Sequence, residues 1–195
     1  KKSSRGGLPR EGGGRFVAAT QGMTVINSLA REHRLFLRLL ERLERAMRYG
    51  EKTGREEIRG GLLVLLQALE RHERIEDAVF SRPAFASARS ARPLLEEVSA
   101  GHRRIADLKA RAEAALAGAE VASLARLGPV ILNLAAELRS HFALEETKLW
   151  PLYQHTHGRS LEHSMASRAR KEVSELETDM KVLWATASDY LSGAR

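Results

Sequence analysis

Six side chains that can bind metal recur at matched intervals along the chain; they are His33, His72, Glu76, His102, His141 and Glu145. The interval from His33 to His72 equals the interval from His102 to His141. Each glutamate follows a histidine by four residues, so one offset carries the first histidine–glutamate pair onto the second. The surrounding segments, RHERIEDAVFSRP and SHFALEETKLWP, also resemble each other. This pattern indicates that a pair of helices carrying two histidines and one glutamate has been used twice.

Helical geometry predicts that these side chains converge in the protein interior. Residues four apart on a helix lie about 40° apart around its axis, so each histidine–glutamate pair points the same way. His33, His102 and His141 all fall in register with apolar residues of their own segments. Burying unpaired imidazoles and carboxylates costs several kcal/mol for each charge. Metal ions would remove this cost, because neutral imidazoles and ionised carboxylates would then share a cation.

The set of donor atoms indicates which metals fit. Nitrogen and carboxylate ligands without sulfur suit iron or manganese, and zinc is a further option. The chain has no cysteine, which excludes disulfides, zinc–thiolate sites, iron–sulfur clusters and thiol nucleophiles. Four histidines and two glutamates are too many ligands for a single tetrahedral zinc ion. The residues therefore predict a dinuclear centre.

Helical periodicity predicts the elements that position these residues. Apolar residues recur at three- and four-residue intervals in four segments, at about 24–48, 55–80, 93–118 and 120–150. A last amphipathic helix is expected at 161–191. No segment alternates as a strand does, and the links are short. We therefore predict an all-α fold, an antiparallel four-helix bundle with an additional C-terminal helix.

Prolines and glycines predict where these helices are interrupted. Pro83 ends the second helix, and residues 84–92 are expected to be a connection. Pro129 marks either the start of the fourth helix or a kink in it. Residues 151–160 are expected to form a loop.

Charge and composition predict how the chain is divided into segments and which classes of partner are not expected. We expect a flexible, basic, glycine-rich tail at 1–22, the bundle at 23–158, and a C-terminal amphipathic helix packed on it at 159–195. The net charge is +7, of which residues 1–15 contribute +4 through five Lys or Arg and one Glu. Aromatic residues are sparse, so no nucleic-acid partner is expected. No apolar run is long enough to span a membrane, so no membrane partner is expected, and the cytoplasm is the predicted location.

The order of the motifs resembles the hemerythrin family, in its bacterial HHE cation-binding form. The segments REHRL, RHERIED, AGHRR and SHFALEE occur in that order over about residues 24–155. The resemblance implies a four-helix bundle that holds two non-haem irons. It assigns the first two histidines to one iron and the last two to the other. It also implies that Glu76 and Glu145 bridge the irons together with an oxo or hydroxo group.

The chain departs from the oxygen-carrying hemerythrins at two positions. Those proteins have a second histidine four residues after the third-helix histidine, where this chain has Ala106, and they end with HxxxxD, where it has Glu146. Four histidines rather than five imply open positions at both metals. This favours binding or reducing hydrogen peroxide, dioxygen or nitric oxide over reversible oxygen carriage. A sensing or iron-storage module without turnover is the alternative.

Four further acidic residues lie near the predicted ligands in the sequence or in register with them. Glu137 lies four residues before His141, which makes it a candidate extra ligand or proton relay. Glu73, Asp77 and Glu146 neighbour the predicted ligands and are expected to be solvated, with a hydrogen bond to a histidine as the alternative. Whether Glu146 adds a ligand is left open by the sequence. The remaining histidines are expected to be exposed and without function; they are His155, His157 and His163. The sequence indicates neither the electron donor nor whether the chain is a monomer or a homodimer.

Overall fold

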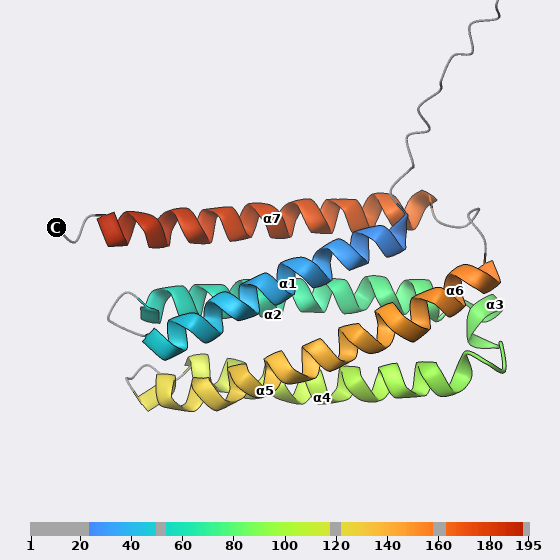
Figure 1. The fold of residues 1–195 in the computed structure, drawn as a ribbon, viewed down its shortest axis with the longest axis horizontal. Helices are drawn as coiled ribbons and strands as arrows, with labels where there is room; N and C mark the ends of the chain where they lie inside the picture. The colour runs from blue at the N-terminus through green and yellow to red at the C-terminus, as the bar shows by residue number, and fades with distance from the viewer. Residues whose placement is uncertain (1–23, 50–53, 118–121, 158–162, 193–195) are drawn as a thin grey trace, which may run out of the picture.

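The computed structural model describes residues 24–49, 54–117, 122–157 and 163–192. These residues form mainly long helices (Figure 1). In chain order the elements are α1 (Val25–Tyr49), α2 (Gly54–Phe80), α3 (Pro83–Ala86), α4 (Arg92–Ala117), α5 (Ala122–Leu144), the π-helical segment η1 (Glu145–Leu149), α6 (Trp150–His157) and α7 (His163–Ser192). These described ranges contain no strand. The all-α prediction is confirmed, and the predicted tail at 1–22 lies outside the described residues.

Four of these helices, α1, α2, α4 and α5, form an antiparallel bundle. Figure 1 shows that consecutive long helices run in opposite directions. Within the bundle, α1 packs against α2 and α5, and α4 packs against α2 and α5. The predicted additional helix is α7, which contacts α1 and α2 and lies on their side away from α4 and α5. None of the described helices is both long and apolar enough to cross a membrane.

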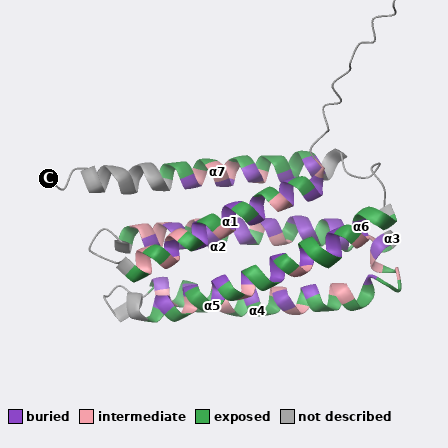
Figure 2. Ribbon diagram, viewed as in Figure 1, coloured by how far each residue is buried: buried purple, intermediate pink, exposed green. Residues whose placement is uncertain are grey.

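Amphipathic sequences explain why these helices pack together. The inward face of α1 is mostly apolar, with buried residues at three- and four-residue intervals on both sides of His33, namely Val25, Ile26, Leu29, Phe36, Leu39, Leu40 and Leu43. Figure 2 shows the same recurrence of buried residues along the other bundle helices. Each buried leucine or phenylalanine contributes about 1.5–3 kcal/mol relative to an exposed one. Packing of these faces therefore holds the helices in fixed register.

Two apolar clusters fill the interior, and they meet at the level of the histidines. On α1, Leu29 belongs to one cluster and Phe36 to the other, and His33 lies between them. His72 on α2 and His102 on α4 likewise lie between residues of the two clusters, in reversed order along α2 because it runs antiparallel to α1. A layer of polar side chains thus divides the core at one height of the bundle.

Two segments differ from the sequence prediction. Residues 84–92, expected to be a connection, begin inside the short helix α3, which has a proline in its first turn. Residues 151–157, expected to be a loop, lie in α6. The fourth predicted helix begins at Ala122 and contains Pro129 in its interior, so it does not start at that proline.

The predicted fourth helix is also divided by a π-helical segment that the sequence did not predict. Residues Glu145–Leu149 form η1, between α5 and α6. Pro151 is the second residue after η1; it has no N–H to donate, and in a regular α-helix its ring would clash with the carbonyl four residues earlier. A wider π turn accommodates this proline and lets the helix continue. Because η1 begins at Glu145, the irregular turn lies at a predicted ligand.

Candidate metal centre

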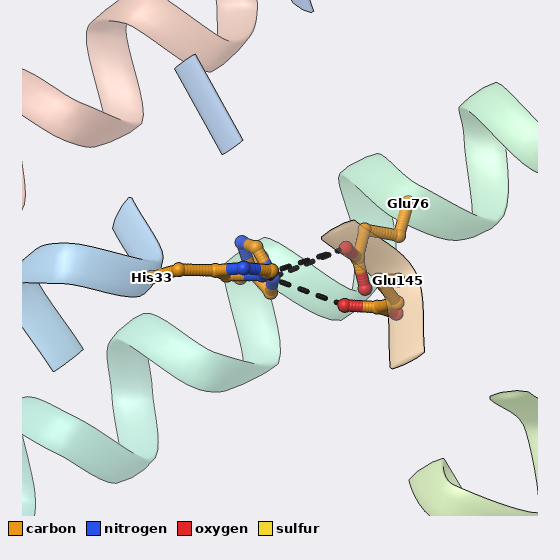
Figure 3. Close-up of side chains that lie close together, drawn as sticks. His33, Glu76 and Glu145 are labelled. Atoms are coloured by element: carbon orange, nitrogen blue, oxygen red, sulfur yellow. Dashed lines mark hydrogen bonds and ion pairs between the residues drawn. The ribbon is translucent and has the colours of Figure 1, made fainter. Parts of the chain in front are cut away.

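The bundle brings all six predicted ligands together in its interior. Each of α1, α2, α4 and α5 supplies one histidine, α2 also supplies Glu76, and η1 supplies Glu145. Five of the six are buried, and the sixth, His102, is partly exposed. Figure 3 shows the His33 ring pointing at the carboxylates of Glu76 and Glu145.

The six residues form two groups of four that share both glutamates. We call them the first position, made of His33, His72, Glu76 and Glu145, and the second position, made of Glu76, His102, His141 and Glu145. In each group the potential ligand atoms all lie within 4.8 Å of one another. The grouping of histidines is the one that the hemerythrin resemblance implies.

The two oxygens of each glutamate face different positions. Glu76 Oε1 lies 3.2 Å from His72 Nε2, while its Oε2 lies 3.4 Å from His102 Nε2. Glu145 Oε2 lies 3.5 Å from His33 Nε2, while its Oε1 lies 3.0 Å from His141 Nε2. A carboxylate that divides its oxygens in this way can hold two cations at once.

Hydrogen bonds at the far sides of two rings set their tautomers. His33 Nδ1 lies 2.9 Å from Glu146 Oε1, and His72 Nδ1 lies 2.9 Å from Glu32 Oε2. When each Nδ1–H donates to its carboxylate, each Nε2 carries a lone pair. The two Nε2 atoms face each other at 3.0 Å. Two facing lone pairs repel, so this arrangement calls for either a proton or a metal ion between the two Nε2 atoms.

The interior of the centre also contains buried polar atoms that lie near one another without making a well-directed hydrogen bond to any protein group. Among the described residues, they include both oxygens of Glu76 and of Glu145, Nε2 of His102, and both ring nitrogens of His141. Leaving such groups without a partner costs about 1–3 kcal/mol each, and more for charged groups. The oxygens and Nε2 atoms of these four residues all belong to the first and second positions. Their chemistry therefore fits metal ions bound between them.

Comparison with known protein families identifies the chain. The family model described as Hemerythrin HHE cation binding domain matches residues 24–127 and, in a second overlapping match, residues 93–194. The chain belongs to the hemerythrin family. The first match contains His33, His72 and Glu76, and the second contains His141 and Glu145, as expected for a duplicated helix pair. Comparisons with curated proteins and with solved structures gave no match.

The two glutamates of this hemerythrin site have pKa values shifted in opposite directions. Burial and the neighbouring Glu76 carboxylate raise the pKa of Glu145 well above its ordinary value. Burial acts on Glu76 in the same direction, but the surrounding histidines, His72 first, outweigh it and lower the pKa of Glu76 well below its ordinary value. Two carboxylates this close do not both ionise without added positive charge. The metal-free site therefore favours a proton on Glu145, which a cation would replace.

The histidines divide into two kinds. Burial lowers the pKa of His33 and of His141 to about 4, so both rings are neutral near pH 7. Burial also opposes protonation of His72, but nearby carboxylates, Glu76 first, outweigh it and raise the pKa well above the ordinary value. The pKa of His102 is raised in the same way. Metal binding in this hemerythrin bundle therefore competes with protons at two of its four histidines.

Aromatic rings fix the orientation of the first position. Phe142 stacks on His33 with ring centroids 3.8 Å apart, and Trp150 stacks on the same ring at 4.8 Å. Phe36 meets His72 edge-on at 5.3 Å. These contacts place apolar surface around the imidazoles and limit the access of water.

The supporting glutamates do not behave alike. Glu137, the candidate extra ligand, lies outside both positions and pairs with Arg104 Nε at 2.8 Å at the surface. This ion pair with Arg104 of α4 holds the Glu137 carboxylate away from both metal positions, although Glu137 lies one helical turn before His141. Glu146 makes the hydrogen bond to His33 that was one of its candidate roles. Of the three histidines expected to be idle, His155 is exposed, and the side chains of the other two lie outside the described residues.

One supporting residue, Glu32, was missed by sequence reasoning. It is buried on α1 and accepts the hydrogen bond from His72 on α2. The signal was present, because Glu32 lies three residues after Leu29 and four before Phe36, within the apolar face of α1. A charged residue at such a position is a candidate partner for a buried ligand.

Proposed function

We propose that this hemerythrin-family chain holds two iron ions and uses them to bind or reduce a small oxidant, namely hydrogen peroxide, dioxygen or nitric oxide. The observation that carries the proposal is the sharing of Glu76 and Glu145 between two groups of ligands. When bound, a pair of ferrous ions supplies up to two electrons to an oxidant. The family match supports a metal-binding bundle, and the choice of iron rests on the donor set of nitrogen and carboxylate oxygen without sulfur.

The protein residues have distinct tasks in this function. Glu76 and Glu145 supply the negative charge that keeps two cations close together. His33 and His141 offer neutral ring nitrogens at neutral pH, because burial lowers the pKa of both. Each position has four protein donors, and a first-row metal with octahedral preference leaves sites for an outside ligand.

The ring contacts at the first position keep bulk water out. Phe142 and Trp150 cover the His33 ring, and apolar clusters close the core above and below the polar layer. A small uncharged oxidant can cross such packing, whereas a larger reductant stays outside. Electrons for repeated turnover therefore have to reach the centre from a separate donor.

Metal analysis tests the proposal directly. Metal-free protein is reconstituted with Fe²⁺ without oxygen, and iron per chain is measured together with the visible spectrum before and after hydrogen peroxide. We expect two irons per chain and a new ferric absorption band after peroxide. The matched controls are the variant Glu76→Gln, which loses iron, and the surface variant Glu137→Gln, which keeps it. One zinc per chain, or no iron after reconstitution, contradicts the proposal.

A second function, ligand sensing without turnover, is favoured by the position of α7. Arg31 on α1 pairs with Glu177 on α7, with the Arg31 Nε 2.9 Å from the carboxylate. Arg71, next to His72 on α2, pairs with Glu172 on α7 at 2.8 Å. A change at the first position would reach α7 through these helices. Steady-state peroxide and nitric-oxide consumption by the iron-loaded chain separates the two functions, because a sensor or an iron store consumes neither.

A further inference from the structure

The internal repeat relates the two metal positions but leaves them with different surroundings. The offset that carries His72 onto His141 also carries His33 onto His102. The same offset carries Glu32, next to His33, onto Gly101. The ligands are thus repeated, while the residues behind them are not.

The repeat makes His72 and His141 equivalent, but Glu32 and Gly101 give these two rings different environments. Glu32 Oε2 accepts the Nδ1–H of His72 at 2.9 Å, and both groups are buried. Gly101 has no side chain, and a Cβ placed on it would lie 2.5 Å from His141 Nδ1. That Nδ1 is buried and has no hydrogen-bond partner. Helix α4 approaches His141 too closely for any carboxylate to stand behind the ring.

The repeat also relates Glu146 to Asp77, and these two carboxylates differ in their contacts because the backbone around them differs. Glu146, in the π turn, accepts a hydrogen bond from His33 Nδ1 although its side chain is 44% exposed. Its counterpart is Asp77, in a regular stretch of α2. Asp77 is exposed and makes no hydrogen bond to His102. Both outer carboxylates therefore serve the first position.

Among the described residues, no other carboxylate forms a hydrogen bond behind a ring of the second position. Glu73 is the other carboxylate near the second position, and it pairs with Lys109 at 3.4 Å rather than with a ring. The second position is also the more open one. Its His102 is 18% exposed at the side chain, whereas His33 is fully covered. Helix α7 covers α1 and α2, the helices that carry both histidines of the first position.

A carboxylate behind a ligating imidazole fixes the ring and makes its other nitrogen more basic, and its loss weakens metal binding about 10–100-fold. We infer that the two positions bind metal unequally: the first position loads first and retains its ion, while the second exchanges its ion readily. Glu32 and Glu146 act as positioning residues that create this order. The inference rests on the proposed two-metal centre.

Titration of the metal-free full chain with Co²⁺ tests the order without any activity assay. The visible absorption bands of bound Co²⁺, together with competition by a chelator, give the affinity of each of the two metal-binding steps. We expect two steps at least about 10-fold apart, with the tighter one weakened about 10–100-fold by Glu32→Gln. Asp77→Asn is the matched control and leaves both steps unchanged. His141→Ala removes the weaker step and keeps the tighter one, which assigns the steps to positions.

The outcomes separate this inference from the proposed function. Two steps of equal affinity, or a Glu32→Gln variant that weakens only the looser step, overturn the inference and leave the two-metal centre intact. Fewer than two Co²⁺ ions bound by the unaltered chain overturn the proposed function, and the inference with it. Glu146→Gln is the second variant, since its exposed side chain makes misfolding no concern, and it must weaken the tighter step as well.

Discussion

At the scale of single residues, the chemistry of the centre depends on what stands behind each imidazole. The rings of His33 and His72 each have one nitrogen toward the centre and the other on a carboxylate. His141 instead packs against the backbone of Gly101. Four rings of the same type thus become ligands of different strength through their neighbours.

Gly101→Ala tests the contact behind His141. The added methyl group would lie 2.5 Å from His141 Nδ1 and 3.2 Å from its Cε1, so the ring has to move. Alanine gains about 1 kcal/mol of helix propensity over glycine, so α4 should remain folded. We expect the variant to lose one of two metal ions per chain, as measured by elemental analysis.

The control for this change is Gly128→Ala on α5. There the new methyl group would meet only the end of the flexible Met47 side chain, at 2.9 Å, which can move aside. This variant should keep full metal content. Wild-type metal content and spectrum in Gly101→Ala would show that the His141 ring tolerates the displacement.

Proton release is the second prediction at this scale. His72 and Glu145 have pKa values raised well above their ordinary values in the metal-free site, so they hold protons that a metal must displace. Protons bound only to the metal-free form favour that form as pH falls, so apparent metal affinity should rise with pH. We expect at least one proton released per chain near pH 7.

Calorimetric titration of Zn²⁺ in two buffers of different ionisation enthalpy measures this release. The surface variant Glu137→Gln should release as many protons as the unaltered chain. A metal affinity that stays constant between about pH 5.5 and 7.5 would contradict the assignment of protons to the two groups.

The residue scale is also where sequence reasoning had most success and its clearest failure. The duplicated pattern of histidines and glutamates predicted six side chains, and the fold brings these six together. Glu32 escaped because a single glutamate in a charged helix has no repeated partner, since its counterpart is Gly101. A pattern search for repeats finds what is duplicated and misses what makes the copies differ.

At the scale of elements, periodicity predicted the long helices because each buries one continuous apolar face. It did not predict η1, since one π turn depends on how Pro151 and the surrounding packing are accommodated. The same limit applies to α6, where the proline and polar residues of 151–157 suggested a loop. Trp150 and Tyr153 are nevertheless buried there, and this packing outweighs the weak local propensity.

The packing of α7 leads to a stability prediction. Leu176 is fully buried in the same apolar cluster as residues of α1 and α2. Leu176→Ala should lower the free energy of unfolding by about 2–5 kcal/mol, because it removes buried surface and leaves a cavity. Val182→Ala on the same helix, where the valine is 62% exposed, should change it by less than about 0.5 kcal/mol.

Urea unfolding followed by circular dichroism measures both variants. Equal effects of the two substitutions would mean that α7 does not share the cooperative core. Because Leu176 is not a predicted ligand, the metal content of the folded variant should stay at the wild-type value.

At the scale of the whole molecule, duplication of a helix pair explains both the four-helix bundle and the destabilising polar layer in its core. Two similar helix pairs pack into one bundle, and their histidines and glutamates meet in a layer that separates two apolar clusters. This layer holds carboxylate oxygens and ring nitrogens without hydrogen-bond partners. Without cations the polar layer opposes the packing of the clusters, and with cations it joins all four bundle helices.

Metal binding should therefore stabilise the entire bundle. A ligand that binds only the folded state adds about 2.7 kcal/mol for each site when its free concentration is 100 times its Kd. We expect the Tm of the metal-loaded chain to exceed that of the metal-free chain, with amide exchange slowed most beside the ligands on α1, α2, α4 and α5. Glu76→Gln removes a ligand shared by both positions, so its Tm should respond little to added metal. Glu137→Gln should keep the full response, because its carboxylate pairs with Arg104 outside the centre. Equal Tm values for the loaded and metal-free chain would mean that the polar layer is already satisfied without cations, which contradicts the metal-centred interpretation of its unpaired atoms.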